Sequence, residues 1–174
     1  MTTVVVPYHP DWPRRFEEER ALLEPVLAPW LEGGIHHIGS TSIPGIAAKP
    51  MIDMMAGVRD LEEARAAFEP LLALGYEETP HRPRTHHFSK RADGEWTHHL
   101  HLTEPGSDLW VERLVFRDTL RANPELVAEY QALKLQMLEE EQRGGNVYSA
   151  VTKRPFVARV LAQAGIEIPA VSPR

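Results

Sequence analysis

The residues best suited to chemistry lie in one stretch, where a short turn separates two apolar segments. The turn is rich in small and hydroxyl-bearing residues, namely Gly39, Ser40, Thr41 and Ser42. Hydroxyl groups beside free backbone N–H groups suit the binding of a phosphate, and a glycine lets the backbone approach a bulky ligand. Lys49 follows the turn and is the cation that we expect to neutralise such an anion.

The apolar segment after the turn, Met51 to Val58, carries one carboxylate, Asp53. A buried carboxylate is costly unless it has a partner, and a metal ion, an arginine or a lysine would serve. A turn of this composition can also be only a turn, and a lone strand carboxylate can be a structural ion-pair partner. Asp53 is therefore a candidate catalytic residue and a candidate metal ligand, with a structural alternative.

Histidines form the second candidate group, since all nine lie at or before His101. His99 and His101 are two residues apart in a predicted strand, so they share one face and His98 lies on the other. With Asp53 they would form a catalytic metal site of two histidines and one carboxylate, which favours Zn²⁺, Mn²⁺ or Fe²⁺ over Mg²⁺. The alternatives are direct contact of these histidines with Asp53 or substrate, and plain packing.

Cations that could hold an anionic ligand come from the C-terminal part of the chain. Arg117 and Arg121 are four residues apart, which places them on one face of a helix. The residues that we expect to bind substrate phosphates here are Arg117, Arg121, Lys134, Tyr148 and Lys153. The alternative for Arg117 is a surface ion pair with Glu112 or Asp118, which would stabilise the chain little.

The remaining polar residues receive weaker predictions. One histidine of the pair His36-His37 is expected to face the site from a strand end, with the other in the core or in solvent. Arg82 and Arg84 lie in a loop interrupted by proline and are expected in solvent. No function is assigned to His86 and His87.

The hydrophobic pattern predicts the elements that would position these residues. Strands are predicted at residues 35–38, 51–58, 76–78, 85–91 and 96–103, the last two as a hairpin around the Asp93-Gly94 turn. Helices are predicted from Trp12 to about Leu27, from Asp60 to Gly75, and at residues 108–122, 124–142 and 149–164. The hairpin argues against a purely parallel sheet, so we expect an α/β (α+β) fold with a mixed sheet covered by helices.

Composition limits the class of protein. The 174 residues, 43% hydrophobic and 25% charged, are typical of one globular domain. We expect residues 1–103 to form a mixed-sheet half, 104–165 a helical half and 166–174 a tail. The net charge of −6 argues against generic nucleic-acid binding, so any anion must meet a local cluster of cations. The chain has no cysteine, no signal-peptide pattern and no membrane-length apolar run, so we expect a cytoplasmic protein.

The stretch around the turn resembles the pattern of the nucleotidyltransferase superfamily. Ile38-Gly39-Ser40 matches the first part, and Asp53-Met54 begins the second at the expected distance. That superfamily has a second carboxylate two residues after the first, where this chain has Met55, a poor ligand for a hard cation such as Mg²⁺. From Trp12 to about Ala164 the chain also resembles the GrpB family, in the segments His37–Thr41, Pro44–Asp53, Leu74–Tyr76, His99–His101, Phe116–Arg121, Tyr130–Lys134 and Tyr148–Lys153.

The resemblance implies a nucleotidyltransferase-like fold, in which a small mixed sheet with helices precedes a C-terminal helical extension. Some relatives are fused to dephospho-coenzyme A kinase, which points to nucleotide or coenzyme metabolism. The implied function is to act on or bind a nucleoside triphosphate and a small acceptor, with a divalent metal (Mg²⁺, Mn²⁺ or Zn²⁺) and no organic cofactor. Met55 favours a non-catalytic protein that binds a nucleotide or phosphorylated metabolite, and the His-x-His pair favours another kind of metal-dependent enzyme. Whether the chain is an enzyme stays open.

Overall fold

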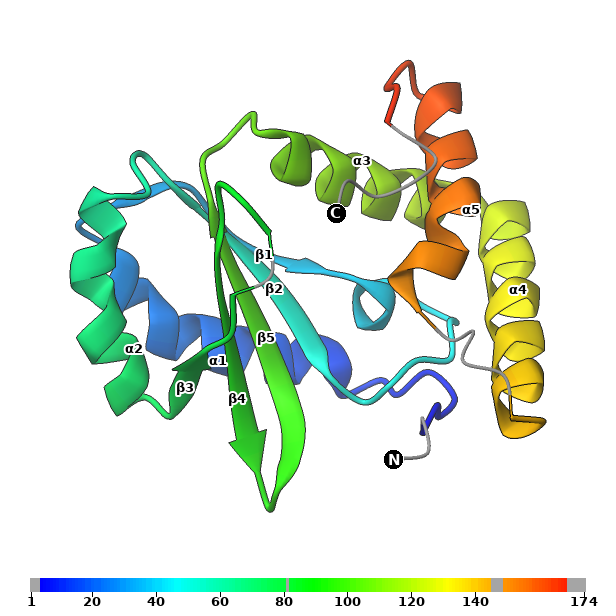
Figure 1. Ribbon diagram of the computed structural model, residues 1–174, viewed down its shortest axis with the longest axis horizontal. Coiled ribbons are helices and arrows are strands. Elements are labelled where there is room, and N and C mark those ends of the chain that lie inside the picture. Colours follow the sequence, from blue (N-terminus) through cyan, green and yellow to red (C-terminus); the bar gives the residue numbers. More distant parts are fainter. Residues whose placement is uncertain (1–3, 81, 145–148, 169–174) are drawn as a thin grey trace.

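A five-stranded mixed sheet forms the centre of the computed structural model, which describes residues 4–80, 82–144 and 149–168 (Figure 1). The strands are β1 (Leu31–Ile38), β2 (Ile52–Val58), β3 (Tyr76–Glu78), β4 (His86–Ala92) and β5 (Glu95–Thr103). They lie in the order β1-β2-β5-β4-β3; β2 and β5 are parallel, and the other neighbouring pairs are antiparallel. The predicted mixed sheet around the β4–β5 hairpin is confirmed.

Helices cover the sheet and extend the chain beyond it. The helices are α1 (Trp12–Leu27), α2 (Phe68–Ala73), α3 (Asp108–Ala122), α4 (Pro124–Gln142) and α5 (Ala150–Gln163). α1 contacts β1 and β2, and α2 contacts β3. α3 contacts both α4 and α5, and these three helices group together on the side away from α2 (Figure 1). The helical extension predicted after the sheet is therefore present.

The predicted helix from Asp60 to Gly75 is divided in two. A 3₁₀ helix, η2 (Glu63–Ala67), precedes the short α2. Pro70 has no amide hydrogen to donate to the carbonyl of Ala66, so the α-helical hydrogen bonds cannot run through this junction. Asp60 acts as the predicted cap, because its Oδ1 accepts a hydrogen bond from the Glu63 amide at 2.8 Å.

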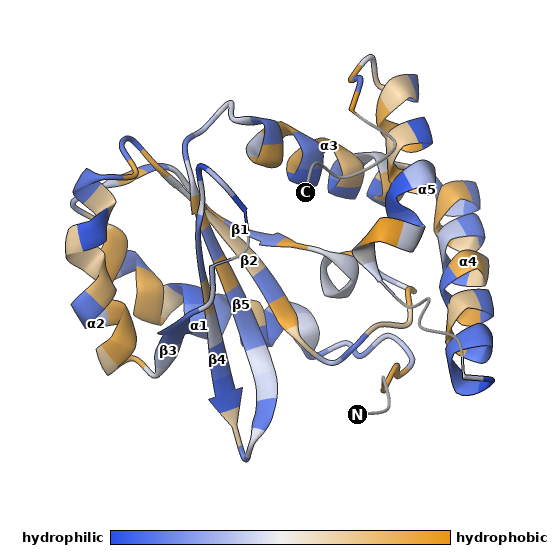
Figure 2. Ribbon diagram, viewed as in Figure 1, coloured by the Kyte–Doolittle hydropathy of each residue, from blue (hydrophilic) through white to orange (hydrophobic). Residues whose placement is uncertain are grey.

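Alternation of side chains gives the sheet two different faces. One face joins the main hydrophobic core. The apolar residues of β2 that contribute to it colour much of this central strand orange in Figure 2. The strand residues of β2 and β5 in this core are Ile52, Met54, Ala56, Val58, Leu100 and Leu102. Trp12 and Leu23 of α1 pack in the same core. The intervening side chains of β2 and β5, including Asp53, therefore face the other way.

A smaller hydrophobic core attaches the C-terminal helices to the loop between β1 and β2. Its buried members are Ile43, Ile46, Leu120, Tyr130, Phe156 and Val160. Because the first two belong to this loop and the others to α3, α4 and α5, burial of apolar surface holds the helices next to the loop. Within the described ranges, no helix has both the length and the apolar character needed to cross a membrane.

Candidate functional site

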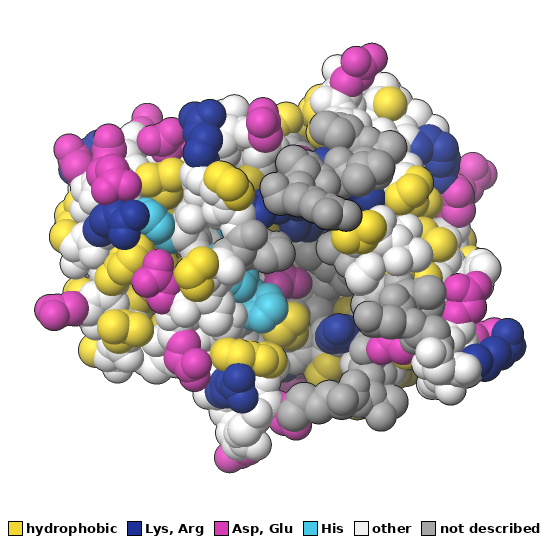
Figure 3. Space-filling view, viewed as in Figure 1, with side chains coloured by type: hydrophobic (Ala, Val, Ile, Leu, Met, Phe, Trp, Pro, Cys, Tyr) yellow, Lys and Arg dark blue, Asp and Glu magenta, His cyan; other side chains and the backbone are white. Residues whose placement is uncertain are grey.

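Two cavities meet at Asp53. The first, of about 210 Å³, is termed the lysine cavity and is lined by Ser40, Thr41, Ala48, Lys49, Met51, Asp53, Lys134, Ser149 and Lys153. The second, of about 230 Å³, is termed the histidine cavity and is lined by Ile38, Gly39, Asp53, His87, His99, His101 and Arg113. Histidine and cationic side chains surround a hollow between the sheet and the C-terminal helices (Figure 3).

Asp53 and His99 lie side by side on neighbouring strands. The parallel pairing of β2 with β5 sets Asp53 opposite His99, and Asp53 Oδ1 lies 3.3 Å from His99 Nδ1. Of the alternatives given for the two histidines, His99 is therefore the one in direct contact with Asp53. His98 projects from the other face, where its Nε2 lies 3.9 Å from Glu19 Oε2.

The backbone of the predicted phosphate turn lies directly against Asp53. Gly39 has φ +71°, a left-handed conformation that favours glycine. A Cβ atom at this position would lie 2.5 Å from Asp53 Oδ2, far inside van der Waals contact. Gly39 is therefore needed for its backbone shape and for the close approach of the turn to the carboxylate.

The rest of the turn forms a 3₁₀ helix, η1 (Ser40–Ser42), that is held by its own hydroxyl groups. Ser42 Oγ donates to the Gly39 carbonyl at 2.6 Å, and Thr41 Oγ1 donates to the Met51 carbonyl at 3.2 Å. Ser42 thereby stabilises the turn but does not line either cavity, whereas Ser40 and Thr41 line the lysine cavity.

His37 supports the turn from the core side of the sheet. Its Nε2 lies 2.9 Å from Thr41 Oγ1, and its ring stacks on Phe16 at 4.9 Å between centroids. Burial lowers the pKa of His37 to about 4, so the ring is neutral at pH 7. His36 contacts the Gly33 carbonyl through Nε2 at 2.7 Å. Neither lines a cavity, so the expectation that one of them faces the site is wrong; His37 reaches it only through Thr41.

Arg117 and Arg121 of α3 hold the region of the turn by hydrogen bonds to its backbone and do not line either cavity. Arg117 Nη1 donates to the His37 carbonyl at 3.0 Å, and its Nε pairs with Asp118 at 2.8 Å. Arg121 Nε donates to the Ser42 carbonyl at 2.8 Å. The carbonyls of His37 at the end of β1 and of Ser42 in the turn thus accept hydrogen bonds from the two side chains that we expected to bind a substrate phosphate. This corrects the expected positions of these two side chains.

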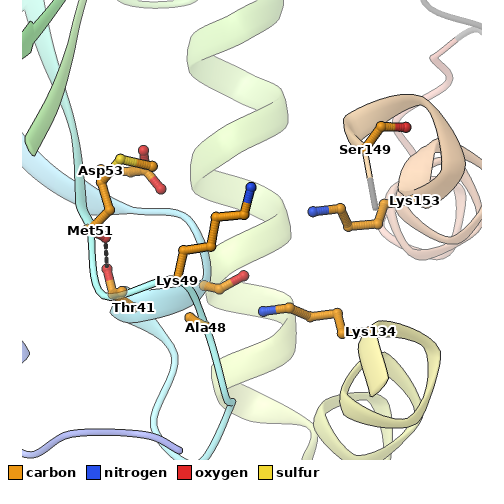
Figure 4. Close-up of a pocket in the computed structure, with 9 residues that line it drawn as sticks. Thr41, Ala48, Lys49, Met51, Asp53, Lys134, Ser149 and Lys153 are labelled. Carbon is orange, nitrogen blue, oxygen red and sulfur yellow. Dashed lines mark hydrogen bonds between the residues drawn. The ribbon is translucent and has the colours of Figure 1, made fainter. Parts of the chain in front are cut away.

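Three lysines approach one another in the lysine cavity, as the close-up shows (Figure 4). Lys49 comes from the loop before β2, while Lys134 of α4 and Lys153 of α5 extend toward it from the C-terminal helices (Figure 4). Lys134 is 2% exposed, and its Nζ donates to the Ala47 carbonyl at 2.6 Å. Lys49, Lys134 and Lys153 thus line one cavity, and their binding of substrate stays a prediction.

Burial, together with repulsion between neighbouring cations, lowers the pKa of two of these lysines. Burial, with further repulsion from Lys153 and Lys49, lowers the pKa of Lys134 to about 7. Burial and repulsion from Lys49 lower the pKa of Lys153 to about 8. Asp53 opposes both shifts but does not cancel them. The surroundings of Lys134 and Lys153 thus disfavour their charged forms, and an anion bound in the cavity would favour those forms.

His87 belongs to the histidine cavity, although no role was assigned to it from the sequence. Its ring centroid lies 4.5 Å from that of His101 and 5.0 Å from that of His99. A regular two-residue hairpin would pair His87 with Leu100 and turn it to the core. The register shift between Lys90 and Arg91 pairs His87 with His101 instead, so it shares the face of Asp53.

Arg113 completes the lining of the histidine cavity. Its Nε is buried and makes no hydrogen bond to any residue that the structure describes. Next to it on α3, Glu112 is buried and accepts a hydrogen bond from Arg154 Nη1 at 2.7 Å. Glu112 Oε2 also lies 3.8 Å from Arg82 Nη1. Arg82 is therefore a partner of a buried carboxylate, which corrects the expectation that it is solvated.

The predicted three-residue metal site is not preassembled. Across the described ranges, no group of three or more histidine and acidic side chains is placed to hold a metal ion. The physical reason is the strand register, because His101 lies opposite Met55, about 7 Å along the strands from the Asp53–His99 pair. Asp53 is the one carboxylate among the residues lining the two cavities, so it is the residue best placed to share a cation that a ligand brings.

Comparison with known proteins matches residues 2–163 to the GrpB protein family. The chain belongs to the GrpB family. It is 35% identical over 167 residues to the glutamate-rich protein GrpB of Alkalihalophilus pseudofirmus, covering 91% of this chain and 93% of that protein. It is 37% identical over 147 residues to UPF0157 protein YqkA of Bacillus subtilis, covering 83% of this chain but 42% of YqkA.

Other GrpB-like sequences are parts of longer proteins. A dephospho-CoA kinase of Mycolicibacterium paratuberculosis is 30% identical over 178 residues, which cover 87% of this chain and 43% of the kinase. Among solved structures, the conserved protein GrpB from Enterococcus faecalis matches with a TM-score of 0.81 and 29% identity, covering 92% of this chain and 96% of that one.

The fold is nucleotidyltransferase-like. A crystal structure of the Cid1 poly(U) polymerase bound to MgATP matches with a TM-score of 0.58, covering 88% of this GrpB chain and 50% of the polymerase. The sequence identity is 14%, so this likeness concerns the fold. It confirms the fold class predicted from the sequence. One predicted ligand of the GrpB site, Tyr148, lies outside the described residues.

Proposed function

We propose that this GrpB protein binds a nucleoside triphosphate in the lysine cavity and transfers its nucleotidyl group to a small hydroxyl- or amine-bearing acceptor. The observation that carries the proposal is that Ser40, Thr41 and three lysines line one cavity beside Asp53. Because the chain has a net charge of −6, this local cluster must supply the attraction for an anion.

The electrostatics of the lysine cavity favour a polyphosphate over a singly charged ligand. Burial, with repulsion from Lys153 and Lys49, disfavours the charged form of Lys134, and burial with repulsion from Lys49 and Arg113 disfavours the charged form of Lys153. Several negative charges placed among the amines reverse the sign of these interactions and favour the ammonium forms. Ser40 of η1, which also lines the cavity, adds a hydroxyl group to these amines.

The transfer itself needs a nucleophile next to the nucleotide and a group that takes its proton. The acceptor oxygen or nitrogen attacks the α-phosphorus, a new bond to phosphorus forms, and the bond to the bridging oxygen breaks. Pyrophosphate leaves with that electron pair. The proton of the acceptor passes to His99, whose Nδ1 is held by Asp53 at 3.3 Å. A divalent cation bound with the triphosphate, shared with Asp53, would neutralise the charge that develops.

A second candidate is binding of a nucleotide or phosphorylated metabolite without catalysis. Met55 favours it, because this fully buried side chain stands where a second carboxylate would hold a metal ion. Incubation with each radiolabelled nucleoside triphosphate, Mg²⁺ or Mn²⁺, and a pool of small metabolites separates the two candidates. Pyrophosphate release with a labelled adduct supports transfer, and binding without turnover supports the second candidate.

The binding itself is tested by thermal shift and calorimetry with ATP, GTP, CTP and UTP, each with and without Mg²⁺, since a ligand of the native state raises its stability. We expect at least one triphosphate to raise the Tm and the corresponding monophosphate to do so less. Lys134→Met should weaken binding at least tenfold. The matched control Arg65→Met removes an exposed cation of η2 and should leave binding unchanged.

Equal loss of affinity in both variants would assign the effect to net charge rather than to the cavity, and would contradict the proposal. Absence of any shift with all four triphosphates, at concentrations of several millimolar, would also contradict it. Circular dichroism of Lys134→Met establishes that the variant is folded before its affinity is compared.

A further inference from the structure

We propose that the histidine cavity is the acceptor site and selects an acceptor that carries an anionic group, a carboxylate or a phosphate, which binds Arg113. The inference rests on the proposed function, because it assigns the second substrate of the same reaction. It adds the chemical class of that substrate and a binding residue, Arg113, to which sequence reasoning gave no role.

The position of the histidine cavity suits a second substrate. Asp53 lines both cavities, while Gly39 lines the histidine cavity and the next residue, Ser40, lines the lysine cavity. A molecule in the histidine cavity therefore lies across the Asp53–His99 pair from the three lysines. An acceptor there would approach the end of the triphosphate that lies next to Asp53, rather than the end among the lysines.

The charges around the histidine cavity favour an anion. Arg113 Nε is buried and makes no hydrogen bond within the described residues. A desolvated donor of this kind is costly, and a carboxylate or phosphate oxygen would satisfy it with a charge-assisted bond. The nearby Glu112 does not serve this purpose, since Arg154 contacts it at 2.7 Å and Arg82 lies 3.8 Å away.

His87, His99 and His101 line the histidine cavity, and among its described lining residues the acidic one is Asp53. Thr79 fixes the ring of His87, whose Nδ1 lies 2.7 Å from Thr79 Oγ1 and 2.9 Å from the Thr79 carbonyl. Imidazoles bind oxygen atoms of a ligand as neutral donors and acceptors, and they bind anions more strongly when protonated. The cavity thus offers Arg113 for the charged group and His99 for the nucleophile.

The test uses histidine side-chain NMR of the full chain, with acetate and inorganic phosphate as probes at constant ionic strength. We expect saturable shifts of the His87, His99 and His101 ring signals, and the stronger of the two probes identifies carboxylate or phosphate as the favoured group. Ethylammonium and glycerol should shift these signals little. Arg113→Gln should raise the dissociation constant of the anion about tenfold, whereas Arg65→Gln should not change it.

Arg113→Lys keeps the positive charge and replaces Arg113→Gln in the test if that variant does not fold. It should lose less affinity for the anion than Arg113→Gln does. Equal anion affinity in the wild type and the folded Arg113 variants, or stronger shifts with ethylammonium, would overturn the inference while leaving nucleotide binding intact. Saturable anion binding in a protein that binds no triphosphate would overturn the acceptor role together with the proposed function.

Discussion

Replacing Lys134 with methionine should remove most of the proton uptake that accompanies nucleotide binding at pH 8. Methionine has a similar length and no charge, so the substitution keeps the packing of a side chain that is 2% exposed. It also removes the hydrogen bond to the Ala47 carbonyl, which accounts for about 1 kcal/mol of stability. Loss of that hydrogen bond by itself takes up or releases no proton when the nucleotide binds. Proton uptake therefore separates the electrostatic role of Lys134 from its structural role.

The expected number of protons taken up on binding follows from the lowered pKa values of two lysines. With pKa values of about 7 for Lys134 and about 8 for Lys153, the free protein at pH 8 lacks about 0.9 and about 0.5 of these protons. A bound triphosphate raises both pKa values, because negative charge favours the ammonium form. Binding to the wild type should then take up about 1.4 protons, and binding to Lys134→Met at most about 0.5.

Calorimetric titration at pH 8 in two buffers of different ionisation enthalpy, Tris and HEPES, measures this uptake. The triphosphate is itself fully ionised at that pH, since its own titration lies near pH 6 to 7. The control Arg65→Met should behave as the wild type. Binding without proton uptake, or the same uptake in the wild type and Lys134→Met, would refute the assignment of the phosphates to the lysine cavity.

Three further outcomes are expected. Gly39→Ala should destabilise the chain by about 1–3 kcal/mol in urea unfolding, because its φ is +71° and its Cβ would meet the carboxylate of Asp53; unchanged stability would contradict the close approach. Asp53→Asn should reduce the Mn²⁺-dependent part of the thermal shift with nucleotide, and an equal shift would remove Asp53 as the cation ligand. Glu112→Gln should lower the free energy of unfolding by about 3–5 kcal/mol, since it removes the negative charge of a buried ion pair with Arg154, whereas Glu62→Gln, at an exposed pair, should lower it by under about 1 kcal/mol.

Much of the fold is predictable from local signals. Pro13 near the start of α1, the apolar run of β2, the Asp93-Gly94 turn and the Ser107 cap of α3 each specify an element within a few residues. The division of residues 60–75 into a 3₁₀ helix and α2 is harder to predict. It depends on one missing hydrogen bond at Pro70, within a pattern that is otherwise typical of one amphipathic helix.

The candidate site is predictable where it depends on strand alternation, and not where it depends on register. The contact between Asp53 and His99 required only that β2 and β5 be neighbours and that both residues point to the same face of the sheet. Predicting the position of His87 required knowledge of the register shift between Lys90 and Arg91, since without it the side chain would point to the core. The different roles of Arg117 and Lys134 likewise follow from how α3 and α4 dock on the loop, which helical spacing alone does not specify.

The distribution of charge supports a ligand more strongly than any single residue does. A chain with six more acids than bases places three lysines around one cavity, where burial and repulsion hold the pKa of two of them well below the usual range. Such an arrangement destabilises the ligand-free protein, because the unfolded chain leaves these amines solvated and apart. Asp53 alone does not offset it. A polyphosphate in the cavity would convert this repulsion into attraction, so under the proposed function the arrangement that lowers stability is also the one that would produce affinity for a nucleotide.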